Sequence, residues 1–258
     1  MLHAPETASA FGDGPAKLIR RVLGRKADPL PLRDSRPSVS GAAKLSQKKR
    51  LTVKRRPVIY KAMPRPANPE TRSRLLEKGG DLVSSRGFNA TGVQEITAAA
   101  GVPKGSFYNY FDSKEAFAVA VLTEYWDAVV AEYGSILGEH STPPLSRIAR
   151  YFAGLAEFHE RRRYAVGCLI GNMALEVTPT SEDVRIKLAA IYREWSAALA
   201  ACLREAQEKG DLSAGKDPGQ LAVALIDTFE GAVMRAKVER SRAPFDSFER
   251  FVLPSLLT

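Results

Sequence analysis

The sequence has few of the features that mark membrane, secreted or metal-binding proteins. Its longest uninterrupted apolar runs, residues 116–122 and 197–203, are seven residues long, whereas a membrane-spanning helix needs about 20. The first 30 residues lack the apolar block of a secretory signal. The two cysteines, Cys168 and Cys202, form no CxxC motif, and the three histidines are scattered. We therefore expect no membrane segment, no disulfide framework, no metal or other cofactor, and a reducing cytoplasmic location.

Positive charge is concentrated at one end of the chain. Residues 1–66 carry 16 Lys and Arg against 4 Asp and Glu, a balance of +12, and residues 67–258 carry 22 against 25, a balance of −3. The first 66 residues are poor in aromatics and rich in proline, a composition that buries too little surface to fold. We expect a disordered basic extension there, either a solvated tail or one that holds DNA phosphates through residues 48–56. Alternatively, translation starts at Met63 and residues 1–62 belong to an over-long gene assignment.

From residue 67 onward the spacing of apolar residues is that of an all-α protein. Residues 72–86 carry one apolar stripe and are followed by Gly87, which is placed to end that helix. A long helix is expected over residues 113–137. Shorter and longer helices follow at about 145–162, 166–176, 181–209 and 218–239. No stretch shows the two-residue alternation typical of a strand.

Residues 89–111 have the pattern of two short helices joined by a tight turn. Thr91 and Gln94 have capping-box spacing at the start of the first helix. Gly101 permits the turn, and a second short helix is expected at about residues 104–111. Two short helices joined by a glycine-containing turn form a helix-turn-helix, whose second helix enters the DNA major groove.

The second of these helices carries residue types that suit a major groove. Its small residues let the backbone approach DNA, its polar residues reach base edges or phosphates, and Phe107 and Phe111 pack inward. The candidate DNA-binding residues are Thr91, Lys104, Gly105, Ser106, Tyr108, Asn109, Tyr110 and Lys114. The alternative is a small three-helix bundle in which the aromatic residues only fill a core.

The stretch over residues 72–125 resembles the DNA-binding domain of the TetR/AcrR family of bacterial repressors. The resemblance rests on Gly-Phe and Thr at 87, 88 and 91, on Ile and Ala-Ala-Gly-Val at 96 and 99–102, and on Lys-Gly-Ser-Phe-Tyr-Asn-Tyr-Phe-Asp-Ser-Lys-Glu-Ala-Phe at 104–117. Tyr110 replaces a histidine that is common in that family. The resemblance implies a helix-turn-helix DNA-binding domain at 67–123 and a sensor and dimerisation domain at 124–258. It also implies a homodimer that binds a palindromic double-stranded DNA operator.

Cys168 is the candidate effector sensor. It follows Gly167 near an expected helix start, where the helix N-terminus would lower the pKa of the thiol and favour the reactive thiolate. Gly-Cys-Leu at 167–169 with Leu-Glu-Val at 175–177 resembles the branch of the TetR/AcrR family that is related to the repressor of N-ethylmaleimide reductase. This resemblance implies electrophile sensing through Cys168, with a basic residue, Lys237, near the thiol. Cys202 lies among Ala and Leu and is expected to be plain core.

Two mechanisms of operator release are open at this point. Either an electrophile or oxidant modifies Cys168, or a small hydrophobic ligand binds without a covalent bond and Cys168 is structural. In both, the change would tilt the helix over residues 113–137, change the separation of the two DNA-reading helices of the dimer and release the operator. The sequence has no Ser-His-Asp cue, phosphate loop or metal motif, so we do not expect an enzyme. A helical adaptor that binds no DNA is the third interpretation.

Overall fold

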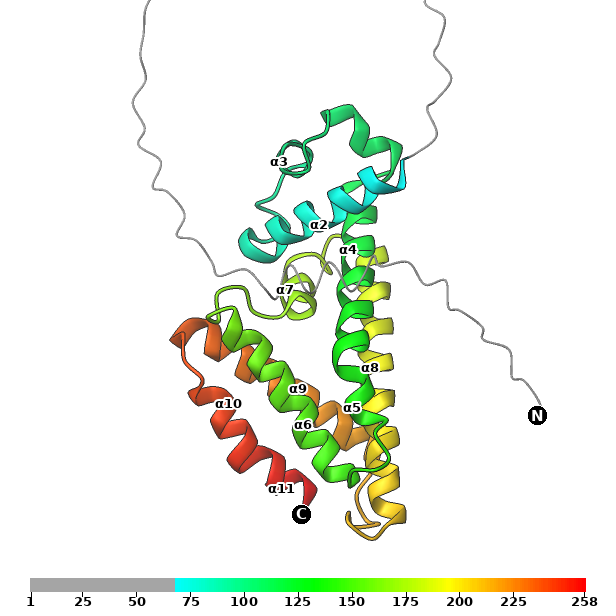
Figure 1. Cartoon of the computed structure of the whole chain (residues 1–258), viewed down its shortest axis with the longest axis vertical. Coiled ribbons are helices and arrows are strands. Elements are labelled where there is room, and N and C mark those ends of the chain that lie inside the picture. The colour runs from blue at the N-terminus through cyan, green and yellow to red at the C-terminus, as the bar shows by residue number, and fades with distance from the viewer. Residues whose placement is uncertain (1–67) are drawn as a thin grey trace, which may run out of the picture. The chain divides into compact units, whose positions relative to one another are not determined.

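The computed structural model describes residues 68–258, and the expectations for residues 1–66 lie outside this part of the chain. Within it every regular element is a helix, so the all-α prediction is confirmed there (Figure 1). In chain order the elements are α2 (Pro69–Arg86), α3 (Val93–Ala99), the 3₁₀ helix η1 (Lys104–Asn109), α4 (Lys114–Val129), the π-helical turn η2 (Val130–Gly134), α5 (Ser135–Leu137), α6 (Pro144–Arg161), α7 (Leu169–Glu176), α8 (Glu182–Glu208), α9 (Pro218–Glu239), α10 (Ala243–Ser247), the π-helical turn η3 (Phe248–Val252) and α11 (Leu253–Leu257).

The turn between α3 and η1 is made by a glycine and a proline. Gly101 has a φ of +67°, a left-handed conformation that glycine adopts without steric cost. The N–H of Val102 reaches back to the carbonyl oxygen of Thr97 at 2.9 Å, and Pro103 precedes η1. The predicted helix-turn-helix is therefore present, although its second helix is a 3₁₀ helix that ends at Asn109.

An aromatic core lies directly beneath η1. Phe107 and Phe111 are both buried, as predicted, with their ring centroids 5.3 Å apart, and Phe117 of α4 packs 5.1 Å from Phe111. Gly79 of α2 lies so close to this core that a Cβ there would be 2.5 Å from Cζ of Phe117 and 2.8 Å from Cγ2 of Ile96. Only a glycine at position 79 lets α2, α3 and α4 approach this closely.

The start of α3 lies one residue later than the capping prediction. Gly92 is the N-cap, and its N–H donates to the carboxylate of Glu95 at 2.9 Å. Thr91 lies just outside the helix and is fully buried, and its hydroxyl donates to the carbonyl oxygen of Gly87 at 2.7 Å. The pairing of Thr91 with Gln94 was therefore wrong, because Thr91 closes the α2–α3 turn instead of capping α3.

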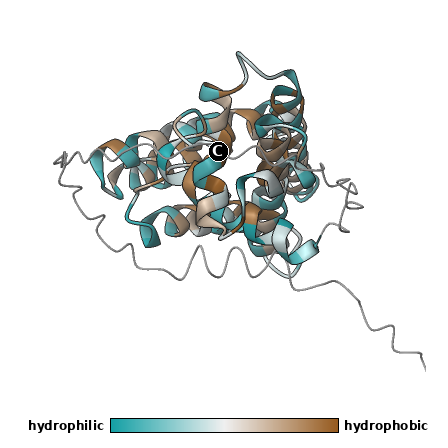
Figure 2. Cartoon of the chain, turned by 90° about the horizontal axis from the view of Figure 1, so that it is seen from above, coloured by the Kyte–Doolittle hydropathy of each residue, from teal (hydrophilic) through white to brown (hydrophobic). Residues whose placement is uncertain are grey.

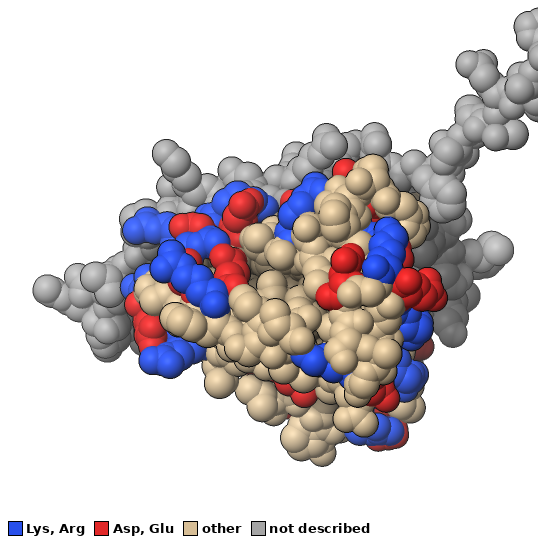
Figure 3. Space-filling model, turned by 90° about the horizontal axis from the view of Figure 1, so that it is seen from below, with Lys and Arg blue, Asp and Glu red and all other residues tan. Residues whose placement is uncertain are grey.

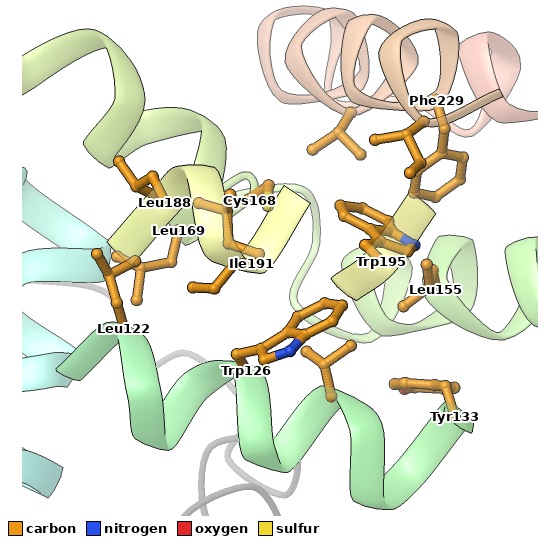
Figure 4. Close-up of a cluster of buried hydrophobic side chains, with 14 of the residues drawn as sticks. Leu122, Trp126, Tyr133, Leu155, Cys168, Leu169, Leu188, Ile191, Trp195 and Phe229 are labelled. Atoms are coloured by element: carbon orange, nitrogen blue, oxygen red, sulfur yellow. The ribbon is translucent and has the colours of Figure 1, made fainter. Parts of the chain in front are cut away.

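The long helix predicted over residues 113–137 is α4 continued through η2 into α5. The hydroxyl of Ser113 accepts a hydrogen bond from the N–H of Ala116 at 2.9 Å and caps its start. Along its length α4 packs against α8 (Figure 1). Trp126 of α4 and Trp195 of α8 meet in this contact with ring centroids 5.8 Å apart (Figure 4). The helix therefore connects the helix-turn-helix to the core of the larger bundle.

The rest of the bundle is built on α6, α8 and α9, which match the helices predicted for this region within a few residues. Phe152 of α6 packs against Phe229 of α9 and Phe248 of η3, with centroids 5.1 and 5.0 Å away. Hydrophobic and hydrophilic residues alternate around the helices, as expected for helices with one buried face (Figure 2). The helical segment over residues 243–257 was not predicted, because Pro244 and Pro254 suggest breaks and instead lie in the first turns of short helices.

A fully buried arginine on α6 contacts both the end of α5 and α8. The guanidinium of Arg147 on α6 donates to the carbonyl oxygen of Leu137 at 2.7 Å and pairs with the carboxylate of Glu205 on α8 at 2.5 Å. Hydrogen bonding to Arg147 lowers the pKa of Glu205 to about 2. The buried charge is thus compensated, which burial of an ion requires.

Candidate functional site

The outer side of η1 presents the predicted DNA-reading residues to solvent. Lys104, Gly105 and Asn109 are exposed, and Tyr108 has 56% of its surface exposed, although it follows the fully buried Phe107. Nothing lies within 4 Å of the position that a Cβ at Gly105 would take. Gly105 is therefore not required by the fold, and its small size leaves the backbone of η1 open to close approach from outside.

Three of the predicted DNA-binding residues have other roles in this structure. Thr91 is fully buried, so it does not reach the surface of the helix-turn-helix. The Nζ of Lys114 donates to the carbonyl oxygen of Phe88 at 2.6 Å and lies 4.0 Å from the centroid of that ring, and burial lowers its pKa. The hydroxyl of Tyr110 accepts a hydrogen bond from the N–H of Asn68 at 3.0 Å. Burial removes Thr91 from the surface that DNA could touch, whereas the DNA contacts expected of the half-buried Lys114 and of Tyr110 stay predictions.

A largely apolar cavity lies between the helix-turn-helix and the bundle. It holds about 860 Å³ of empty space, part of it open to solvent, and its wall comes from α2, α4, α6, α8, α9 and the start of α7. Trp126, Leu155, Trp195 and Phe229 supply apolar surface (Figure 4). The polar groups on the wall include Tyr125, His159, Arg162, Cys168 and Glu230. Apolar pockets with a few convergent polar groups are typical of small-molecule sites.

Cys168 lies on the wall of this cavity and is the N-cap residue of α7. It is buried, with 7% of its surface exposed. Burial, and then the negative charge of Glu230, raise the pKa of the thiol well above its usual range, although the N–H groups of Ile170 and Gly171 act in the opposite direction. The helix N-terminus does act to lower this pKa, but the expected net lowering is wrong, because loss of water around the sulfur outweighs the two backbone N–H groups.

Glu230 of α9 is the acidic neighbour of this thiol. Burial raises the pKa of the Glu230 carboxyl to about 7, and the neighbouring Cys168 acts in the opposite direction. The carboxylate lies over Gly171, where a Cβ would be 2.6 Å from Oε2 of Glu230 and 4.0 Å from the Cβ of Cys168. The absence of a side chain at Gly171 is what lets the acid and the thiol share this corner of the cavity.

Burial shifts the pKa of three further polar residues on the cavity wall, Tyr125, His159 and Arg162. Burial raises the pKa of Tyr125 well above its usual value. Burial and the charge of Arg162 lower the pKa of His159 to about 3, so this imidazole is neutral. Burial also lowers the pKa of Arg162, whose guanidinium lies 5.2 Å from the ring centroid of Phe158.

Lys237 lies beside the backbone that leads to Cys168. Its ammonium-bearing side chain is exposed, and its Cδ is 3.2 Å from the position that a Cβ at Gly167 would take. The structure therefore brings Lys237 to Gly167, the residue before Cys168, and its role in sensing stays a prediction. The charged side chain that chiefly acts on the thiol is Glu230, however, and it raises the pKa of Cys168.

The far end of α7 contacts the helix-turn-helix. The Glu176 carboxylate accepts a hydrogen bond from the N–H of Asn89 at 3.1 Å, and the Asn89 amide donates to the carbonyl oxygen of Glu176 at 3.2 Å. Gly87, with a φ of +91°, lies so close that a Cβ there would be 2.7 Å from Oε1 of Glu176. One helix therefore joins the cavity, at Cys168, to the α2–α3 turn, at Asn89.

Helices α8 and α9 expose a number of small and apolar residues among charged ones. Its exposed members include Ile186, Ala197, Ala198, Ala201, Val223, Gly231, Met234 and Val238. The two helices pack on each other over much of their length. The face of the molecule seen from below carries charges of both signs around a central uncharged area (Figure 3).

Two further absences are found over residues 68–258. No group of three or more His, Cys, Asp or Glu side chains there could hold a metal ion. None of the helices in this part of the chain is long and apolar enough to cross a membrane.

Sequence reasoning missed Glu230, Tyr125, Arg162 and His159 as cavity residues. Glu230 did carry a signal, because it lies at the edge of the buried stripe of α9, between Ile226 and Val233. An acid at the edge of such a stripe is either paired or has a shifted pKa. The cavity itself has no signal of this kind, since its wall draws on six helices far apart in the sequence.

Comparisons with known proteins agree on one family. The family model for bacterial regulatory proteins of the tetR family matches residues 75–121, and the model for tetracyclin repressor-like C-terminal domains matches residues 144–252. The HTH-type transcriptional repressor DhaR of Mycobacterium sp. (strain GP1) is 41% identical over 191 residues, which cover 74% of this chain and 94% of that protein.

Solved structures show the same relationship. The regulatory protein TetR from Rhodobacter sphaeroides is similar with a TM-score of 0.68 and 34% identity, over 73% of this chain and 99% of that one. The reduced form of NemR from E. coli is similar with a TM-score of 0.64 and 31% identity, over 73% of this chain and 98% of that one.

Proposed function

This chain belongs to the TetR family of bacterial regulatory proteins, and we propose that it is a transcriptional repressor that binds a palindromic operator as a homodimer. The observation that carries the proposal is the outward presentation of η1, with Lys104, Gly105, Tyr108 and Asn109 exposed above a rigid aromatic core. A helix held in this way by a buried Phe107 can enter a major groove without rearrangement. Residues 67–123 are then the DNA-binding domain. Because a bacterial repressor acts on DNA, we expect the protein in the cytoplasm.

The dimer is proposed to form through the outward face of α8 and α9. Exposed Ala197, Ala198, Ala201 and Gly231 let a second helix pair approach closely, and Ile186, Met234 and Val238 add apolar surface. Large apolar side chains exposed together on a globular protein are typical of an interaction site. A two-fold pair also presents two copies of η1, as a palindromic operator requires. Residues 124–258 are then the sensor and dimerisation domain.

Release of the operator is proposed to begin in the cavity, with an electrophile or oxidant that modifies Cys168. The position of Cys168 at one end of α7, with the Glu176–Asn89 contact at the other, supports this route. An effector shifts the equilibrium between the DNA-bound and the released conformation only to the extent that it binds the released conformation more tightly than the other. The alternative is a small hydrophobic ligand that binds non-covalently. The apolar wall and the protonated thiol favour that alternative.

The test is operator selection from random DNA, followed by gel shifts on the selected sequence. The proposal predicts that a palindrome is enriched. It also predicts that N-ethylmaleimide releases this DNA from the wild-type protein but not from Cys168→Ser. Release of both proteins by the same compound would discard the thiol route and leave the non-covalent one. No enrichment of any sequence would contradict the repressor assignment.

A further inference from the structure

The two tryptophans of the chain meet on the wall of the cavity but differ in how their indole N–H groups are paired. Trp126 of α4 donates to the carboxylate of Glu194 at 2.7 Å. Trp195 of α8 is 3% exposed, and its Nε1 has no hydrogen-bond partner within residues 68–258. Most buried donors in proteins have an acceptor, because leaving one without a partner costs free energy. The Trp195 N–H is therefore free to donate to another molecule.

This donor faces other residues of the cavity wall. Figure 4 shows the indole nitrogen of Trp195 on the side of Leu155 and Phe229, away from Trp126, and all four residues line the cavity. Burial raises the pKa of Tyr151 on α6, and the Trp195 indole acts in the opposite direction, so these two groups are neighbours. Their geometry is not that of a hydrogen bond, however. An acceptor on a bound molecule would thus satisfy the N–H without breaking a hydrogen bond of the protein.

His159 of α6 is a second buried polar side chain on this wall. It is 5% exposed, and its ring contacts Phe158 and Phe245 with centroids 5.1 and 5.8 Å away. No group in the described part of the chain hydrogen-bonds to its imidazole. Burial and then the charge of Arg162 lower the pKa of His159 to about 3, so the ring carries no charge at neutral pH. The interior of the cavity therefore presents uncharged polar groups beside apolar surface.

The wall disfavours a charged ligand of either sign. An ammonium group has no lone pair to accept from the indole N–H. A carboxylate would meet more acids than bases, since the wall contains Glu77, Asp81, Glu124 and Glu230 against Arg162. Either ion would also lose its water on entering a largely apolar cavity. A carbonyl group fits better, because its oxygen accepts hydrogen bonds without carrying a charge.

We propose that the cavity binds an uncharged, mostly apolar molecule that carries a carbonyl group, and that the carbonyl oxygen accepts a hydrogen bond from Nε1 of Trp195. The rest of the molecule lies against Trp126, Leu155 and Phe229. No covalent bond forms, so binding does not depend on Cys168. The proposal rests on the proposed function only in taking this cavity as the effector site.

The test is titration calorimetry of the full chain with four compounds that share a cyclohexyl ring and have the same number of carbon atoms. They are cyclohexyl methyl ketone, ethylcyclohexane, cyclohexylacetate and 2-cyclohexylethylamine. We expect the ketone to bind roughly threefold to tenfold more tightly than the hydrocarbon, as one hydrogen bond allows, and more tightly than either ion. Equal binding of ketone and hydrocarbon, tighter binding of an ion, or no binding of the ketone would overturn the proposal.

Two matched variants test the donor itself. Trp195→Phe removes the N–H and keeps an aromatic ring, so the ketone is expected to lose its advantage over the hydrocarbon. Trp126→Phe is the control, because the N–H that it removes already has Glu194 as its acceptor, and it is expected to keep that advantage. A retained advantage in Trp195→Phe would overturn the proposal. Loss of the advantage in both variants would do the same, since ring packing and not the N–H would then set it.

A measurement on the unaltered chain covers the case in which Trp195→Phe does not fold. The chain has two tryptophans, so labelling them with nitrogen-15 gives two indole N–H signals in a proton–nitrogen correlation spectrum, and Trp126→Phe assigns them. The ketone is expected to move the Trp195 proton signal to lower field, as a new hydrogen bond does. An unmoved Trp195 signal at saturating ketone would overturn the proposal.

Operator binding by the ligand-free protein is measured in parallel by gel shift. Loss of that binding would contradict the repressor assignment and leave the ligand titrations untouched. The titrations and the indole signals alone decide the role of Trp195.

Discussion

The Glu176 carboxylate accepts a hydrogen bond from the backbone N–H of Asn89 at 3.1 Å, and this contact joins the end of α7 to the α2–α3 turn. The same turn holds Phe88, whose carbonyl oxygen accepts from Lys114 of α4 at 2.6 Å. The charge of Glu176 also acts on Lys114. A change at Cys168, which begins α7, therefore has a short covalent and hydrogen-bonded route to the helix-turn-helix.

Glu176→Ala tests this route. The variant loses the acceptor for the Asn89 N–H, so a shift of α7 moves the α2–α3 turn less, and we expect the effector-induced drop in operator affinity to shrink severalfold. Allosteric couplings are typically 5- to 150-fold, so such a loss is measurable by titration with and without effector. Asp183→Ala, at an exposed position on α8, is the control. An unchanged coupling in Glu176→Ala would show that the signal travels elsewhere, for example along α4.

Gly79 and Gly80 are neighbours on α2 with opposite surroundings. A Cβ at Gly79 would meet Phe117 at 2.5 Å, whereas a Cβ at Gly80 would meet only Val121 at 3.5 Å. Gly79→Ala is expected to lower the free energy of unfolding by about 1–3 kcal/mol through overpacking. Gly80→Ala is expected to raise it by up to about 1 kcal/mol, because alanine favours a helix. Urea denaturation of both variants measures this, and equal effects would contradict the packing described here.

Glu230 gives the stability of the protein a specific pH dependence. Its carboxyl pKa is about 7 in the folded chain and ordinarily 4.5, so the folded state binds the proton more tightly than the unfolded state. The stabilisation from this group is therefore fully present below about pH 4.5 and is lost as the pH rises through 7. Denaturant titrations from pH 4.5 to 8 are expected to show this loss in the wild type and not in Glu230→Gln. Parallel curves for the two proteins would contradict burial of this carboxyl.

The outward face of α8 and α9 is testable by adding one charge. Nothing lies within 4 Å of the position that a Cβ at Gly231 would take, so Gly231→Arg fits the single chain. At a two-fold interface it would bury two like charges, and we expect sedimentation to show a dimer for the wild type and a monomer for Gly231→Arg. Ser247→Arg, on exposed α10 surface, is expected to remain dimeric. A dimeric Gly231→Arg would place the interface elsewhere.

The parts that could be predicted from sequence depend on local patterns. The inward positions of Phe107 and Phe111, the glycine of the turn and the helices from α6 to α9 all follow from spacing within one segment. The N-cap of α3 was predicted one residue too early, at Thr91 instead of Gly92. The pair of Gly92 and Glu95 has the same capping-box spacing as the predicted pair of Thr91 and Gln94. Such a choice is set by the packing of Thr91 into the α2–α3 turn, which the local sequence does not reveal.

The reactivity of Cys168 could not be judged from its neighbours in sequence. Its helix position predicted a lowered pKa, but the outcome depends on Glu230, 62 residues further along the chain, and on burial by several helices. The roles of Lys114 and Arg147 were also set by distant partners, the carbonyl of Phe88 and the carboxylate of Glu205. Electrostatic properties of this kind arise only when the helices are packed.

Hydroxyl-radical footprinting on the selected operator tests the central claim, that a symmetric pair of η1 helices reads DNA. We expect two protected patches on one face of the duplex, separated by about 10–10.5 base pairs or a whole multiple of that. Gly105→Ala should weaken protection at least severalfold with unchanged stability, because its methyl group points into space that is empty in the free protein. A single patch, or protection that Gly105→Ala and Lys104→Ala both leave intact, would contradict the account.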